Sequence, residues 1–223
     1  MAIGRIVTQN PTDARSWRAA SRSRAVGMMR WIERALFVAG FVFLGYYLYV
    51  TAEARLYQNV ENRELDLILA SAPATRPPAA PVPVPPVPGS MLGRIEIPRL
   101  GVSAVIRAGS DARTLRLAVG HIPGTALPGQ TGNIGLAGHR DTFFRRLRDI
   151  RADDDIRLVT TSGTFAFKVD ATTIVLPKDT WVLNPTPTST LTLVTCYPFT
   201  YVGSAPKRFI VQAVATSSEQ AIS

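Results

Sequence analysis

The amino-acid sequence predicts a mainly β domain, a closed barrel or a sandwich with short helices, preceded by one transmembrane helix. Runs of alternating apolar and polar residues recur between residues 91 and 218, and Gly- and Pro-containing turns separate them. Helical patterns are too scarce there for βαβ units. An uncharged run of 18 residues, 35–52, lies between Arg34 and Glu53. As a helix it spans roughly 27 Å, close to the hydrocarbon thickness of a bilayer.

The charge of the chain is concentrated before this apolar run. The 223 residues carry a formal net charge of +9, which raises the question of a nucleic-acid partner. Residues 1–34, however, hold seven arginines and two acidic residues, so +5 of the excess lies there. Such a basic flank stays in the cytoplasm and directs the rest of the chain outward. We therefore expect membrane lipid, and no nucleic acid, as a partner.

The chain divides into five predicted segments. They are a basic cytoplasmic segment (1–34), a transmembrane anchor (35–52), a juxtamembrane helix with a proline-rich stalk (53–90), the β domain (91–218) and a tail (219–223). The stalk has eight prolines among residues 73–88 and predicts a polyproline II spacer of roughly 50 Å. Two alternatives for the apolar run are a buried core helix and a signal peptide cleaved near residues 52–54.

Within the β domain the alternation predicts seven strands and one short helix. A hairpin turn is expected at Ser162-Gly163, and one or two helical turns at 111–119. The last two strands are expected to pair as a hairpin with residues 197–207 as its loop. The predicted strands are 92–97, 102–106, 132–139, 156–161, 164–176, 190–196 and 208–216.

The single cysteine of the chain is a candidate nucleophile. It excludes an internal disulfide framework and, with only two histidines, a structural zinc site of the usual kind. Cys196 ends the β run 191–196, where the period of two places Leu191 and Leu193 on one face and Cys196 on the other. A lone thiol outside the cytoplasm is prone to oxidation, and a nucleophilic cysteine needs a base or a cation nearby. The alternative is a buried cysteine that packs as a small apolar residue.

Three residues are candidates to assist this thiol. His139 closes a short strand before a polar loop and is the favoured general base, whereas His121 lies among turn residues and is its rival. Arg208 begins the strand that pairs with the one ending at Cys196, so a guanidinium there can lower the thiol pKa or stabilise an oxyanion. The alternative for Arg208 is a solvated arginine at the rim.

Other polar residues have a structural interpretation. Asp141 would complete a Cys-His-Asp triad, but its closeness to His139 in sequence favours a role in holding the loop. The run Asp153-Asp154-Asp155 is expected to be an exposed turn rather than a cation site. A cluster of arginines just after His139 alternates with apolar residues and predicts an amphipathic rim of solvated side chains: Arg140, Arg145, Arg146, Arg148 and Arg151.

Three motifs together resemble those of the sortases, a family of membrane-anchored bacterial cysteine transpeptidases. The run 190–196 (TLTLVTC) is similar to the family's TLxTC signature, 137–141 (AGHRD) to its histidine segment, and 207–211 (KRFIV) to its late arginine segment. The likeness covers residues 92–216. The flanking runs 119–125 (VGHIPGT) and 196–199 (CYPF) look most like class D.

The resemblance implies an eight-stranded barrel and a Cys196, His139 and Arg208 site supported by Thr195. Cys196 would attack a backbone carbonyl of an LPxTG-like sorting motif, and an amine would resolve the thioacyl-enzyme at the cell surface. The implied partners are secreted proteins with a C-terminal sorting motif and an amine acceptor from a cell-wall peptide or a protein. No cofactor is expected, and nothing in the sequence supports calcium. The stretches 132–139 and 177–190 should border the peptide groove. Alternative functions are an extracytoplasmic cysteine protease and an inert membrane-tethered binding protein.

Overall fold

The structure, a computed structural model, describes residues 13–71, 85–201 and 203–216. Within it the chain forms two compact units, Met1–Ala52 and Glu53–Ser223. The predicted tail at 219–223 and most of the predicted polyproline spacer at 73–88 lie outside the described residues. The same holds for the first residues of the basic segment.

Helix α1 runs from Asp13 to Ser71 and includes the predicted anchor and juxtamembrane helix. Its stretch from Met28 to Ile68 is, by length and composition, apolar enough to cross a membrane. None of the apolar window is buried inside the chain, which a core helix would not show. The large side chains of the window are exposed, for example Phe37 at 62% and Phe41 at 72%.

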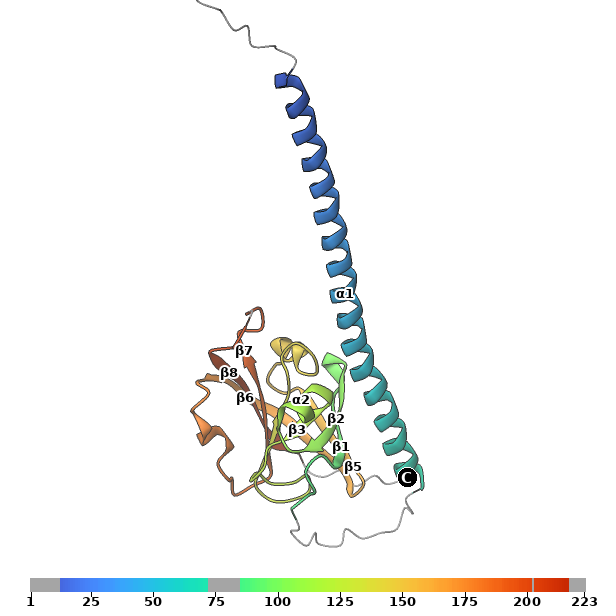
Figure 1. Cartoon of the computed structure of the whole chain (residues 1–223). Helices are drawn as coiled ribbons and strands as arrows, with labels where there is room; N and C mark the ends of the chain where they lie inside the picture. Colours follow the sequence, from blue (N-terminus) through green and yellow to red (C-terminus); the bar gives the residue numbers. More distant parts are fainter. Residues whose placement is uncertain (1–12, 72–84, 202, 217–223) are drawn as a thin grey trace, which may run out of the picture. The chain divides into compact units, whose positions relative to one another are not determined.

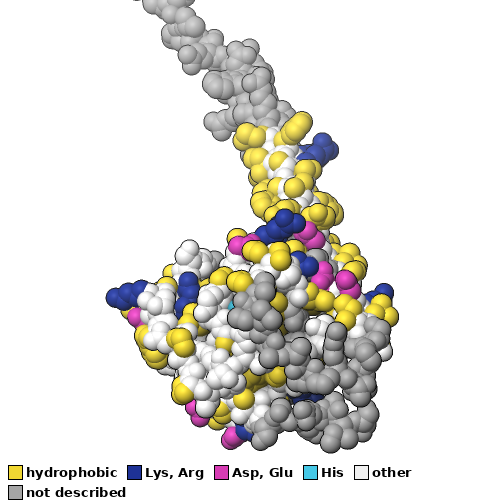
Figure 2. Space-filling view, turned by 90° about the horizontal axis from the view of Figure 1, so that it is seen from below, with side chains coloured by type: hydrophobic (Ala, Val, Ile, Leu, Met, Phe, Trp, Pro, Cys, Tyr) yellow, Lys and Arg dark blue, Asp and Glu magenta, His cyan; other side chains and the backbone are white. Residues whose placement is uncertain are grey.

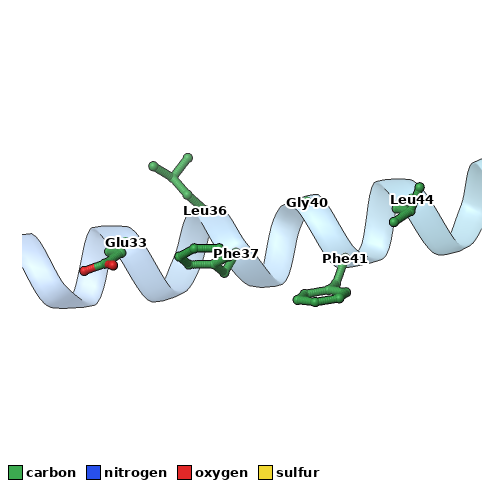
Figure 3. A pocket seen from close by; sticks show the side chains of 6 residues that line it. All are labelled: Glu33, Leu36, Phe37, Gly40, Phe41 and Leu44. Carbon is green, nitrogen blue, oxygen red and sulfur yellow. The ribbon is translucent and has the colours of Figure 1, made fainter.

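A shallow apolar hollow lies on α1 (Figure 3). Its lining residues all come from successive turns of this helix: Glu33, Leu36, Phe37, Gly40, Phe41 and Leu44. Because Gly40 has no side chain, the neighbouring rings of Phe37 and Phe41 leave a gap there. The hollow is therefore a surface feature of one apolar helix, and no residue of the second unit lines it.

The second unit holds eight strands that close into a barrel in the order β1-β2-β3-β4-β7-β8-β6-β5 (Figure 1). Closure leaves no sheet edge unpaired, and the sandwich alternative is wrong. Each of the seven predicted strands is present, with ends within two residues of those predicted. The strands are β1 (Met91–Ile97), β2 (Val102–Ala108), β3 (Val119–His121), β4 (Asn133–Ala137), β5 (Asp155–Thr160), β6 (Gly163–Val175), β7 (Thr190–Tyr197) and β8 (Lys207–Ala215).

Strand β3 is the one that the alternation does not predict. It has three residues, and it pairs in parallel with β2 at Ile106↔Val119 and antiparallel with β4 at His121↔Leu136. The predicted helical turns are confirmed as α2 (Ala112–Leu117), whose first turn is capped by the Asp111 carboxylate. Three 3-10 helices complete the described unit: η1 (Pro98–Leu100), η2 (Arg145–Asp149) and η3 (Thr180–Leu183).

Two apolar clusters surround the wall formed by β4, β7 and β8. The larger one fills the barrel and includes the fully buried Leu136, Leu191 and Leu193. The smaller one packs between the outer face of the strands and η3, around Val182 and Ile210. Because β4 and β7 run in parallel, their C-terminal ends lie at the same end of the barrel.

The end of α1 contacts the barrel within the second unit. The Gln58 side chain donates to Leu117 O at 2.6 Å and accepts from Val105 N at 2.9 Å. Leu65 is 1% exposed. Two ion pairs flank these contacts, each with an N–O distance of 2.9 Å: Arg107–Glu61 and Arg94–Asp66. Residues 58–66 therefore pack as part of the barrel's unit.

Candidate active site

Cys196 and Arg208 lie directly opposite one another on β7 and β8. Residues opposite each other in an antiparallel pair present their side chains on the same face of the sheet. Both side chains are half-buried, whereas Leu191 and Leu193 are fully buried on the other face of β7. The predicted pairing of the two strands, and the separation of Cys196 from the two leucines, are confirmed.

The backbone before His139 is held against the strand that carries Cys196. Gly138 N donates to Val194 O at 3.1 Å, and the Thr195 hydroxyl donates to Gly138 O at 2.8 Å. Thr195 is 2% exposed, so this hydrogen bond is buried. These two hydrogen bonds therefore fix the backbone that carries the exposed His139 beside the end of β7. The fold brings the predicted cysteine, histidine and arginine to one end of the barrel.

The turn that follows His139 explains the glycine before it. Phe144 is fully buried, and its backbone N–H donates to His139 O at 3.1 Å. A Cβ at Gly138 would lie 2.6 Å from the Phe144 ring, closer than real Cβ contacts allow. Any side chain at Gly138 would therefore displace Phe144 and the turn that carries His139.

His121 occupies a different environment from His139. It is 3% exposed, and its Nε2 lies 2.9 Å from Ala126 O. Because a carbonyl oxygen can only accept, Nε2–H of His121 is the donor to Ala126 O. Burial lowers the pKa of His121 below its ordinary value. His121 thus holds the loop after β3 rather than facing solvent.

Gly135 on β4 is packed closely between the loop after β3 and η3. An ideal Cβ at Gly135 would lie 2.9 Å from the Thr125 methyl group and 3.1 Å from a Leu183 methyl group. The loop after β3 and η3 therefore both pack against β4 at this glycine. Two stretches expected to border a groove, 132–139 and 177–190, do lie side by side here.

A buried amide that was not predicted as a site residue joins η3 to β4. Asn133 is 4% exposed, and its Nδ2 donates to Val182 O at 3.0 Å and to Asn184 O at 3.2 Å. Its Oδ1 accepts from the Thr192 hydroxyl at 2.8 Å. The sequence signal that could have indicated this role is that Asn133 is a polar residue at the start of an otherwise apolar strand.

Of the arginines predicted to be solvated, Arg140 is the exception. It is 7% exposed, so the prediction is wrong for this residue, while Arg145, Arg146, Arg148 and Arg151 are exposed as predicted. Burial follows from hydrogen-bond partners far away in sequence, in the loop after β7. The exposed Asp141 carboxylate lies 3.5 Å from Arg140 Nε, which fits the predicted structural role.

The acidic run 153–155 is exposed as predicted at Asp153 and Asp155, but the prediction is wrong for Asp154. Asp154 is buried and pairs with Arg99, and hydrogen bonds from Arg99 lower the pKa of the Asp154 carboxyl. Asp155 lies 3.6 Å from Lys168 Nζ, and Asp153 takes a positive φ of 65°. The described residues contain no group of three or more His, Cys, Asp or Glu side chains that could hold a metal ion.

The charged side chains on the face shown in Figure 2 are scattered. Lys and Arg alternate with Asp and Glu around the barrel, and apolar and uncharged polar groups lie between them. Among the described residues on this face, no continuous basic stripe follows the surface as it does in proteins that track a phosphate backbone.

A closed eight-stranded barrel with Cys, His and Arg at one end defines a class of cysteine enzymes, and comparison with known proteins identifies the family. Residues 95–216 match the sequence model of the Sortase domain. The match covers more than half of the chain, and the chain belongs to the sortase family. Members of this family are membrane-associated cysteine transpeptidases that act on proteins with a sorting motif.

Two relatives place the chain within the family. It is 40% identical over 124 residues to Sortase D of Bacillus subtilis (strain 168), an alignment that spans 55% of this chain and 63% of the relative. It is 32% identical over 130 residues to Sortase SrtE1 of Streptomyces coelicolor, spanning 50% of this chain and 37% of the relative. The chain therefore covers less than two thirds of either relative's length.

Solved structures give the same placement. A Clostridium perfringens Sortase D5 transpeptidase is 32% identical with a TM-score of 0.55, covering 59% of this chain and 82% of that one. Sortase C-1 from Actinomyces oris is 31% identical with a TM-score of 0.51, and the match covers 56% of this chain and 73% of that one. The eight-stranded sortase-type barrel implied by the motifs is confirmed, and the chain is most like class D.

Proposed function

We propose that this chain cleaves an LPxTG-like sorting motif through a thioacyl-enzyme and transfers the acyl group to an amine at the cell surface. The observation that supports the proposal is the placement of three residues at one end of the barrel. Cys196 lies opposite Arg208, and His139 follows a backbone position tied to β7 by two hydrogen bonds. Nucleophile, acid–base group and cation are the parts that acyl transfer to an amine requires.

The reaction consists of two acyl transfers with one proton carrier. The Cys196 thiolate attacks the carbonyl carbon of the scissile peptide bond, and the C–N bond breaks as His139 gives a proton to the departing amine. The incoming amine then attacks the thioester carbon, His139 takes its proton, and the C–S bond breaks. Arg208 stabilises the oxyanion of each tetrahedral intermediate or holds a substrate carbonyl. Thr195 and His121 keep the surrounding backbone in place.

The partners in this proposal follow from the two acyl transfers. The acyl donor is a secreted protein with a C-terminal sorting motif, and the acceptor is an amine of a cell-wall peptide or a protein. Residues 35–52 anchor the chain with its N-terminus in the cytoplasm, and the basic segment before them supports this orientation. Protease added to intact cells should then digest the barrel and spare an N-terminal tag.

The full-length chain in detergent micelles provides the test. It is incubated with a fluorescent LPxTG-type peptide, with and without triglycine, and the products are identified by mass spectrometry. We expect a triglycine adduct that depends on Cys196 and disappears in Cys196→Ala. Cleavage without adduct under saturating triglycine would indicate a hydrolytic protease instead. Binding without cleavage, unchanged by Cys196→Ala, would indicate an inert binding protein.

The proposed reaction needs no bound metal. The three reacting side chains supply nucleophile, proton transfer and charge stabilisation between them, and Asp154 already pairs with Arg99. We expect the rate of adduct formation to be the same with EDTA and with added calcium. A calcium-dependent rate would contradict this part of the proposal.

A further inference from the structure

Arg140 connects the histidine turn to the loop that separates Cys196 from Arg208. Its Nη1 donates to Pro198 O at 2.7 Å, and its Nη2 donates to Tyr201 O and, at 3.4 Å, to Gly203 O. All three acceptors are backbone carbonyls of the β7–β8 loop (Figure 1). The guanidinium is thus adjacent to His139 in sequence and bound to the loop that begins just after Cys196.

The chemistry of this contact requires an arginine. A buried cation is costly unless its N–H groups have acceptors, and the three carbonyls supply them. The planar guanidinium presents several donors at fixed angles, whereas a lysine ammonium is a point charge with a different reach. The neighbouring Asp141 carboxylate is exposed and lies 3.5 Å from the Arg140 Nε. The loop carbonyls are therefore the main partners of Arg140.

The same loop also determines where Arg208 lies. Arg208 Nη1 donates to Ala205 O in the loop at 3.2 Å and to Lys207 O at the first residue of β8 at 3.0 Å. Without Arg140, the loop loses the hydrogen bonds to its Pro198, Tyr201 and Gly203 carbonyls. Ala205, the loop residue that holds the Arg208 guanidinium, would then lose its fixed position.

We propose that Arg140 is a positioning residue of the transpeptidase site. It fixes the β7–β8 loop to the His139 turn and thereby holds Arg208 at the position opposite Cys196. In this proposal Arg140 acts through the loop and takes no part in the acyl transfer itself. The inference deepens the proposed function, since the loop borders the site where the acyl group is transferred.

The test compares Arg140→Met and Arg140→Lys with Arg148→Met in the full-length chain. Arg148 is a matched control, because its guanidinium is exposed and forms an ion pair with the adjacent, exposed Asp149 at 3.3 Å. Chymotrypsin cleavage after Tyr201, identified by mass spectrometry, reports the freedom of the loop without any substrate. Removal of several hydrogen bonds from a charged donor is expected to speed this cleavage at least about tenfold in Arg140→Met. Arg148→Met should cleave at the wild-type rate.

Kinetics with the sorting peptide provides the second measurement. We expect kcat/KM to fall about tenfold or more in Arg140→Met. The kcat/KM of Arg140→Lys should lie between that of Arg140→Met and that of the wild type. The pH profile with which iodoacetamide alkylates Cys196 in Arg140→Met should match that of Arg208→Met, because in both variants the Arg208 guanidinium is lost from its position opposite the thiol. A profile that differs from that of Arg208→Met would show that Arg140 acts on the thiol by another route and would overturn the proposal.

Each remaining outcome also decides the question. Unchanged cleavage after Tyr201 in Arg140→Met would overturn the proposal, and so would acceleration at every site of the barrel, which indicates general destabilisation. If Arg140→Met does not fold, Arg140→Lys carries the test, and wild-type cleavage and kinetics in that variant would refute the need for a guanidinium. The proteolysis result stands even if the peptide is not a substrate, so failure of the proposed function remains distinguishable.

Discussion

At the scale of single residues, the two histidines differ in access to solvent. A general acid–base group must reach the substrate and exchange its proton with it. His139 is exposed at the end of the barrel, whereas His121 is 3% exposed and bonded to Ala126 O. The geometry favours His139 for proton transfer and leaves His121 a structural role.

We predict that His139→Ala lowers kcat/KM for transpeptidation by about 10²–10⁴-fold, the usual effect of removing a general acid–base group. His121→Ala should reduce activity far less, through a loosened loop after β3. Steady-state kinetics of both variants, together with their melting temperatures, checks this. Equal losses of kcat/KM in the two variants, with equal stability, would show that the base is assigned to the wrong histidine.

The buried His121 also predicts a pH dependence of stability. Its pKa in the folded chain is lowered by desolvation from the ordinary value of 6.5, so the unfolded chain binds the proton more readily. The contribution to stability is complete above pH 6.5 and is lost as the pH falls below that value toward the folded pKa. His121→Gln, which keeps a donor but does not titrate, should flatten the change between pH 7.5 and 5.5. Urea unfolding at both pH values measures it, and an unchanged slope would contradict the prediction.

At the scale of elements, the network at Asn133 decides where η3 lies. Asn133 bonds Val182 O, Asn184 O and the Thr192 hydroxyl, and these hydrogen bonds join η3 to β4 and β7. Without the amide, Asn184 O loses this donor, and Val182 O keeps only the longer contact from the Thr192 hydroxyl at 3.4 Å. The helix η3 would then be held less firmly against β4.

Asn133→Ala should therefore lower the free energy of unfolding by about 1–3 kcal/mol and raise KM for the peptide more than it lowers kcat. Thr172→Val is a suitable control, because Thr172 lies on β6 with its side chain exposed. Denaturant unfolding and peptide kinetics measure the two effects. If KM stayed at the wild-type value while stability fell, η3 would not form part of the substrate site.

The elements also show what sequence alone can and cannot predict. Alternation predicts the longer strands, because each has one face in the barrel, and the Cys196–Arg208 pairing follows from a hairpin register. Strand β3 is not predicted, because its three residues with a central glycine show no alternation. The burial and hydrogen bonds of Asn133 and Arg140 are not predicted, because their partners lie 49 or more residues away in sequence. Local pattern carries no signal of such contacts.

At the scale of the whole molecule, the folded unit begins before the proline-rich segment. Gln58, Glu61 and Asp66 bond barrel residues, and Leu65 is buried among these contacts. The predicted division gives 53–90 as a juxtamembrane helix and a proline-rich stalk. Within this segment, the contacts of residues 58–66 place the helix end in the same packed unit as β1 and β2, so this helix end contributes to the stability of the barrel.

A pair of neighbouring leucines tests this assignment in the full-length chain. Leu65 is 1% exposed and Leu67 is 71% exposed, although both lie on the same turn of α1. Removing a buried leucine side chain costs about 2–5 kcal/mol through lost burial and a residual cavity, whereas an exposed one costs within about 0.5 kcal/mol. Leu65→Ala should therefore lower the melting temperature of the barrel by at least about 4 °C, and Leu67→Ala should leave it nearly unchanged. Near-ultraviolet circular dichroism in detergent follows the barrel, and equal melting temperatures for the two variants would show that the helix end is a separate spacer.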